Sequence, residues 1–80
     1  MNDREILSAI ERMVEEEHQL LDETSKEEAS AELHTRLAEL QVSLDQSWDL
    51  LRRRRARREF GQDPATTEPR DATTVERYEQ

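Results

Sequence analysis

The 80-residue sequence contains no cysteine, one glycine, two prolines and three aromatic residues. Without cysteine, the chain can form neither a disulfide nor a cysteine-ligated metal site. A single glycine excludes a glycine-rich phosphate loop. The few β-branched residues never alternate along a run, so we expect no strands. Charged residues, in contrast, make up 40% of the chain. The sequence is also rich in Glu, Leu, Ala and Arg, and this composition is typical of long helices and coiled coils.

Long hydrophobic runs are also missing. No segment approaches the roughly 18 consecutive apolar residues of a membrane span. The first residues, MNDREIL, are acidic and lack the basic and apolar regions of a signal peptide. We therefore expect a cytoplasmic protein without a membrane partner, and the lack of cysteine fits that compartment.

The net charge of −8 is unevenly distributed. Residues 1–51 carry 4 basic and 14 acidic side chains (−10), residues 52–58 carry 6 arginines (+6), and residues 59–80 carry 2 basic and 6 acidic side chains (−4), which together give −8. An acidic body is not expected to bind nucleic acid, whereas a local arginine cluster can.

Two segments have the apolar periodicity of helices. In the first, which should begin at Asn2 or Asp3, one apolar stripe recurs at helical spacing and is interrupted only by Glu17. In the second, leucines and Trp48 recur at steps of three and four until Gly61, which suits a helix end after Phe60. Its start is open among Ser25 in a capping box, Thr24 and Ser30. The predicted seam consists of Ile6, Leu7, Ile10, Met13, Val14, Leu20, Leu21, Leu33, Leu37, Leu40, Leu44, Trp48 and Leu51.

Two helices joined by a short loop favour an antiparallel hairpin. We expect an all-α hairpin over residues 1–60, in which Glu17 lies near Arg36, and an irregular or flexible tail over 61–80 that Val75 and Tyr78 can anchor. One hairpin leaves part of its seam exposed to water. The sequence therefore predicts a homodimer that forms a four-helix bundle.

The segments MNDREIL, VEEEHQL (14–20) and LDQSWDLLRRRRARREFGQDP (44–64), with the ending VERYEQ, resemble a domain-of-unknown-function family of short actinobacterial proteins. The resemblance covers nearly the whole chain. The family often has a cysteine where Ser47 lies, so no thiol chemistry is carried over. The resemblance implies a helical hairpin and assigns no activity.

The arginine run is the main candidate for binding a partner. It consists of Arg52, Arg53, Arg54, Arg55, Arg57 and Arg58. Three interpretations stay open. The run can be a solvated helix end whose cations complement the helix dipole, a patch that binds an acidic protein, or a patch that binds nucleic acid. The last interpretation lacks the support of aromatic residues between the arginines, which would stack on bases. Local pairs at four-residue spacing, Asp49 with Arg53 and Arg55 with Glu59, fit the first interpretation.

Metal binding and catalysis have little support in the sequence. Glu15 and His18 form a Glu-x-x-His pair, but both lie off the apolar stripe, where a bundle interior would need them. We therefore predict no metal, no cofactor and no enzyme activity. The expected function is a non-enzymatic interaction or adaptor module that self-associates through the seam and presents the arginines to an acidic partner. The alternative is a small nucleic-acid- or ribosome-associated factor.

Overall fold

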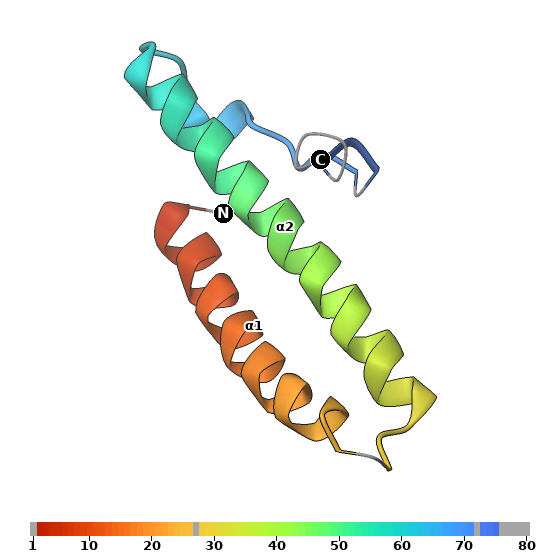
Figure 1. Cartoon of the computed structure of the whole chain (residues 1–80). Coiled ribbons are helices and arrows are strands. Elements are labelled where there is room, and N and C mark those ends of the chain that lie inside the picture. The colour runs from red at the N-terminus through yellow and green to blue at the C-terminus, as the bar shows by residue number, and fades with distance from the viewer. Residues whose placement is uncertain (1, 27, 72, 76–80) are drawn as a thin grey trace.

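The computed structural model of the chain describes residues 2–26, 28–71 and 73–75, and within them it contains two long helices, one short 3-10 helix and no strand. Helix α1 spans Asp3–Thr24, α2 spans Ala31–Glu59, and the 3-10 helix η1 spans Pro64–Thr66. The long helices lie side by side and antiparallel, joined at one end by a short turn (Figure 1). The expected all-α antiparallel hairpin is confirmed.

Helix α1 begins with a reciprocal cap. The Asn2 side chain accepts a hydrogen bond from the Glu5 amide at 2.9 Å, and the Asn2 amide donates to the Glu5 carboxylate at 3.1 Å. Two amides that have no partner within the helix are thereby satisfied. Of the two predicted caps, Asn2 is the one used, which leaves the Asp3 side chain available for contacts elsewhere.

Helix α2 begins at the latest of the three predicted starts. The Ser30 hydroxyl accepts a hydrogen bond from the Leu33 amide at 3.2 Å and so caps the helix. Ser25 instead closes α1, where its hydroxyl donates to the Asp22 carbonyl at 2.7 Å. The capping box at Ser25 is therefore not formed, because that serine already serves the end of the preceding helix.

The end of α2 is set by Gly61. This residue has φ of 74°, a left-handed conformation that glycine adopts without steric cost. Its amide donates to the Arg58 carbonyl at 3.2 Å, and the Gln62 amide donates to the Arg57 carbonyl at 2.7 Å. These two bonds make a Schellman motif, so the predicted stop after Phe60 is confirmed.

The core lies in the half of the hairpin that is distant from the turn. Its centre is Ile6, Ile10, Leu44 and Leu51, each at most 6% exposed, with Leu7, Met13, Val14 and Leu50 packed around them. Leu20 and Leu40 are buried nearer the turn. Within the predicted seam, Met13, Leu33 and Leu37 are half-buried, whereas Leu21 is 45% and Trp48 is 40% exposed.

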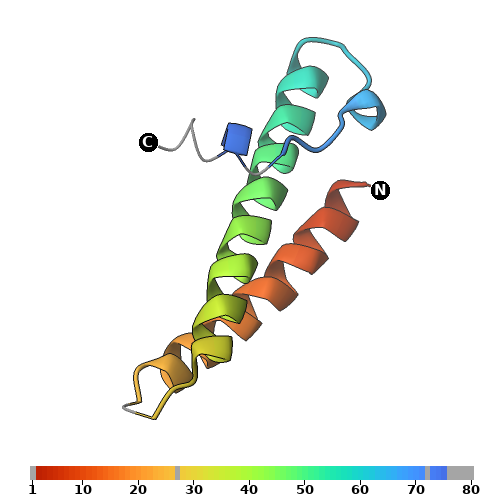
Figure 2. The same ribbon diagram turned by 90° about the vertical axis from the view of Figure 1, so that its right-hand side faces the viewer.

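The chain after α2 turns back beside that helix instead of prolonging it (Figures 1 and 2). Val75 is 1% exposed, as expected for an anchor of the tail, while Tyr78 lies outside the described residues. The Asp71 carboxylate accepts hydrogen bonds from the amide and hydroxyl of Thr74, and these bonds lower the pKa of Asp71. Apart from η1 and a helical turn at 73–75, the described tail is irregular.

Neither long helix, nor any other in the described ranges, is long and apolar enough to cross a membrane.

Candidate interaction surfaces

The arginine run is divided by the fold into residues that contact the chain itself and residues that face solvent. Arg54 belongs to the first group and is 8% exposed. Its Nε donates to Asp3 Oδ1 at 2.7 Å, and its Nη1 donates to the Pro64 carbonyl at 2.9 Å. One guanidinium therefore joins the start of α1 to the returning tail.

Asp3 receives a second arginine from the next turn of α2. Arg58 Nη2 donates to Asp3 Oδ2 at 2.5 Å, so the carboxylate holds one cation on each oxygen. The hydrogen bond from Arg54, followed by that from Arg58, lowers the pKa of Asp3 below its ordinary value. Asp3 therefore holds Arg54 and Arg58 against the start of α1.

Two further arginines fasten the tail. Arg53 donates to the Glu68 carbonyl and to Asp49 Oδ2, the latter at 3.1 Å. Arg57 Nη1 donates to Thr66 Oγ1 at 2.5 Å. We call Arg53, Arg54, Arg57 and Arg58 the arginine clasp, since each binds a group of the chain that is distant in sequence.

Asp49 is a buried carboxylate that the sequence marks only as a partner of Arg53. It is 5% exposed and lies within ion-pair distance of Arg53 (3.1 Å), Arg70 (3.5 Å) and Arg52 (3.9 Å). The Arg70 carbonyl also accepts a hydrogen bond from Gln46 Nε2 at 3.4 Å. The predicted Asp49–Arg53 pair is present, and it forms part of the attachment of the tail.

Arg52 and Arg55 face away from the clasp. Both are exposed, and the Arg52 side chain is 58% accessible despite its distant contact with Asp49. Among the described residues Arg55 forms no ion pair, so the expected partnership with Glu59 is absent. These two arginines follow Trp48 by 4 and 7 residues, which places all three side chains on one strip of α2.

The same side of the hairpin carries a groove of about 400 Å³. Leu7, Ile10, Val14 and Trp48 form its apolar lining. Glu11, Glu15 and His18, all exposed, complete it on the side of α1. The groove is lined by four residues of the predicted seam, of which Ile10 is buried, Leu7 and Val14 are half-buried and Trp48 is exposed.

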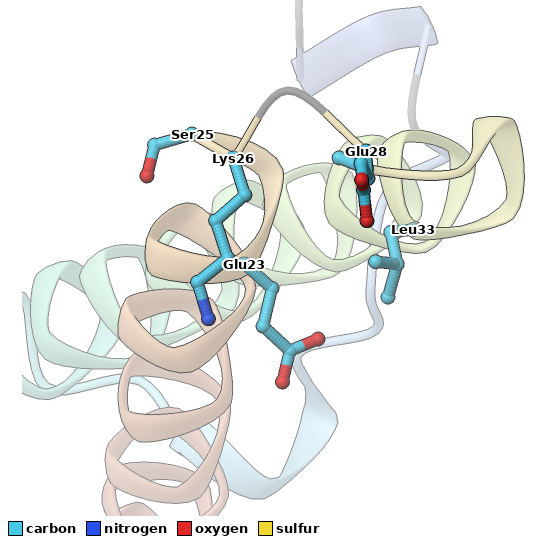
Figure 3. A pocket seen from close by; sticks show the side chains of 6 residues that line it. Glu23, Ser25, Lys26, Glu28 and Leu33 are labelled. Carbon is cyan, nitrogen blue, oxygen red and sulfur yellow. The ribbon is translucent and has the colours of Figure 1, made fainter.

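The turn contains a second hollow, of about 620 Å³, lined by Glu23, Ser25, Lys26, Glu28, Ala29 and Leu33. In Figure 3 the Glu23 and Lys26 side chains extend from the end of α1 on one side of it, and Glu28 and Leu33 stand on the other. Four of its six lining residues are polar or charged and exposed, which is typical of a solvated turn.

Arg36 of α2 pairs with a glutamate of α1 across the hairpin. Arg36 was expected to neutralise Glu17 but forms a bidentate pair with Glu16, with bonds of 2.9 and 3.0 Å that raise the pKa of Arg36. Glu16 and Glu17 are both half-buried, and it is the Glu16 carboxylate that reaches Arg36. Glu15 and His18 are exposed, and the described residues contain no group of three side chains placed to hold a metal.

The fold and these surfaces define a small helical-hairpin protein with a charged clasp at one end and an uncovered apolar groove on one face. The chain matches the family described as protein of unknown function (DUF2630) over residues 2–80, and it belongs to that family. The uncharacterized proteins Rv0898c of Mycobacterium tuberculosis and Mb0922c of Mycobacterium bovis are each 40% identical to it over 77 residues, which cover 95% of this chain and 88% of theirs. No solved structure matches significantly. The resemblance to a family of short actinobacterial proteins is confirmed.

Proposed function

We propose that this protein is a cytoplasmic, non-enzymatic helical interaction module that self-associates through the groove face. Self-association would complete a four-helix bundle, in which a second hairpin covers the half-exposed part of the seam. The groove is lined chiefly by aliphatic side chains and Trp48, which suits packing against another helix better than it suits acid–base chemistry. The cytoplasmic setting is supported by the absence of cysteine from all 80 residues.

The observation that carries this proposal is the position of Trp48. It is the only tryptophan, it is 40% exposed, and it lines an apolar groove. Exposing a large aromatic ring beside other apolar side chains is unfavourable in water, and tryptophan is enriched among the residues that dominate binding at interfaces. A partner that covers the groove would remove this exposed surface.

Two of the six arginines of the run are proposed to bind a partner. We propose Arg52 and Arg55 as the residues that meet an acidic surface, because they share one strip of α2 with Trp48 and remain exposed. The alternative, a nucleic-acid- or ribosome-associated factor, has less support, since the four clasp arginines already bind groups of the chain itself. RNA binding that is lost with R52Q/R55Q would favour this alternative.

Sedimentation velocity over a wide range of protein concentrations tests the proposal. The wild type should shift from monomer to dimer as concentration rises, and the emission of Trp48 should move to shorter wavelength when the ring leaves water. Trp48→Ala should weaken the dimer by tenfold or more, roughly the effect of losing a central aromatic anchor.

Phe60→Ala is the matched control. Phe60 is 81% exposed at the end of α2 and does not line the groove, so its loss should leave the dimer constant unchanged. A wild-type chain that stays monomeric at every concentration, with constant Trp48 emission, would refute self-association. Equal effects of the two substitutions would refute the role of the groove.

A further inference from the structure

The groove face has opposite charge at its two ends. On α1, Arg4, Glu11, Glu15 and Asp22 are all exposed. Arg4 and Asp22 are 18 residues apart, or five helical turns, and therefore share one strip of the helix with Glu11 between them. This strip changes from positive at the start of α1 to negative towards the turn.

Helix α2 adds to the same gradient. Arg52, Arg55 and, one turn further, Glu59 continue the Trp48 strip towards the end of α2, and all three are exposed with a net charge of +1. The antiparallel hairpin places this part of α2 beside the start of α1, as the contact between Asp3 and Arg54 demonstrates. We define the basic end of the face as Arg4, Arg52 and Arg55, and the acidic end as Glu15 and Asp22.

We propose that the groove takes a second copy of this chain in antiparallel orientation, so that the basic end of each copy lies over the acidic end of the other. This inference rests on the proposed self-association and specifies its geometry. In a twofold interface each contact occurs twice, so an antiparallel pair contains two favourable junctions. A parallel pair would instead bring both basic ends together and both acidic ends together, and such like-charge contacts disfavour an arrangement.

The two kinds of surface have different roles in this arrangement. Burial of Trp48 and its aliphatic neighbours supplies the driving force, because the hydrophobic effect has no preferred direction. The charges select the orientation, because Coulomb energies depend on which side chains face each other. The selectivity should therefore weaken with salt, while the association itself persists.

Spin-label distances can test the orientation directly. The chain has no native cysteine, so Gln62→Cys creates a single labelling site beyond the end of α2. Antiparallel copies should hold two such labels about 40 Å apart or more, since α2 alone is about 43 Å long. Parallel copies would bring them within roughly two interhelical distances, about 20 Å.

Ser25→Cys, at the turn, provides the matched measurement. Two Ser25 labels should also lie far apart, whereas a Ser25-labelled copy mixed with a Gln62-labelled copy should give a short distance. Short distances between identical labels would overturn the antiparallel arrangement. They would still demonstrate self-association. A chain that is monomeric under all conditions would overturn both, and would leave the groove to a different protein.

Charge reversal tests the cause of the orientation. R52E/R55E and E15R/D22R should each weaken the dimer by about tenfold at low salt, because each variant converts both junctions to like charge. Combining all four reversals restores opposite charges at both junctions, so the dimer constant should return towards that of the wild type. A dimerisation constant that is the same in the wild type and in all three variants would overturn the electrostatic part of the inference. Circular dichroism verifies that each variant remains helical.

Discussion

The two ends of the hairpin are built from different interactions. At the arginine end, three segments meet, and the clasp joins the start of α1, the end of α2 and the returning tail through Asp3, Asp49 and backbone carbonyls. At the turn end only two helices meet, and the Arg36–Glu16 pair is exposed on both sides. The fully buried leucine of the arginine end, Leu51, contrasts with half-buried Leu33 at the turn.

This difference shows how a helix ending rich in like charge can be held in place by hydrogen bonds and ion pairs to other segments. Arginines that are sequence neighbours repel one another, but each clasp member binds an acceptor outside α2. Arg54 and Arg58 bind Asp3, and Arg53 and Arg57 bind the tail. Removing one partner of a buried ion pair also costs more than removing one partner of an exposed pair, because the remaining charge is left buried and unpaired. We therefore expect the stability of the chain to be concentrated at the arginine end, and the following experiments test that expectation in order of decreasing effect.

The largest contrast should come from the apolar core. Leu51→Ala should reduce the free energy of unfolding by about 3 kcal/mol, because a side chain that is 1% exposed leaves a cavity when truncated. Leu33→Ala should cost about 1 kcal/mol, since that side chain is only half-buried. Urea unfolding followed by circular dichroism at one protein concentration measures both values. Similar losses would contradict the proposed concentration of stability.

The second contrast lies between two adjacent arginines. Arg54→Gln should cost about 2 kcal/mol, because it removes charge-assisted hydrogen bonds at a buried position. Arg55→Gln changes the net charge identically but should cost less than about 0.5 kcal/mol, since Arg55 is exposed. Thermal and urea unfolding of the two variants give the comparison. A larger loss for Arg55 would show that the clasp does not stabilise the fold.

The helix caps should contribute less to the free energy of unfolding, and the caps at the two ends of the hairpin should contribute equally. Gly61→Ala should cost about 1 kcal/mol, because alanine is strained at φ of 74° although no atom lies within 4 Å of the added Cβ. Ser30→Ala should also cost about 1 kcal/mol through the loss of the cap of α2. Helicity and unfolding free energy measure both. A neutral Gly61→Ala would indicate that the Schellman turn is not formed in solution.

Acid should have the smallest and most local effect. The hydrogen bonds from Arg54 and Arg58 lower the pKa of Asp3 in the folded state below the value of 3.8 that an ordinary aspartate has. Its contribution to stability is therefore complete above that value and is lost as the pH falls through the folded pKa. Asp3→Asn should flatten the pH dependence of unfolding in that window, and R54Q/R58Q should have a similar effect. An unchanged profile in both variants would contradict the Asp3 pairing.

The periodicity of the apolar residues was enough to predict the hairpin. Leu40, Leu44 and Leu51 are buried where the period of α2 places them, and Gly61 ends the helix for a local steric reason. The site was less predictable. Helical spacing put Trp48 on the seam, yet it is 40% exposed, because the narrower contact between two helices does not reach the edge of a wide apolar stripe.

The tertiary contacts of charged residues could not be predicted from helical periodicity. Arg36 binds Glu16 rather than Glu17, because the flank on which each side chain emerges depends on how the two helices are rotated against each other. The start of α2 was likewise open among three residues until Ser25 was found at the end of α1. Long polar side chains can satisfy several partners, so sequence spacing alone does not select one.

The sequence by itself therefore determined the two helices, the end of α2 and the antiparallel pairing, because these follow from local periodicity, from local capping and from a short connection. Only the tertiary structure decided that the arginine run is divided, with Arg54 buried against Asp3 and Arg55 left in solvent. The acceptors that make this division lie 51 residues away at Asp3 and on a tail without regular pattern. Their positions depend on how three segments pack together, which no local pattern encodes.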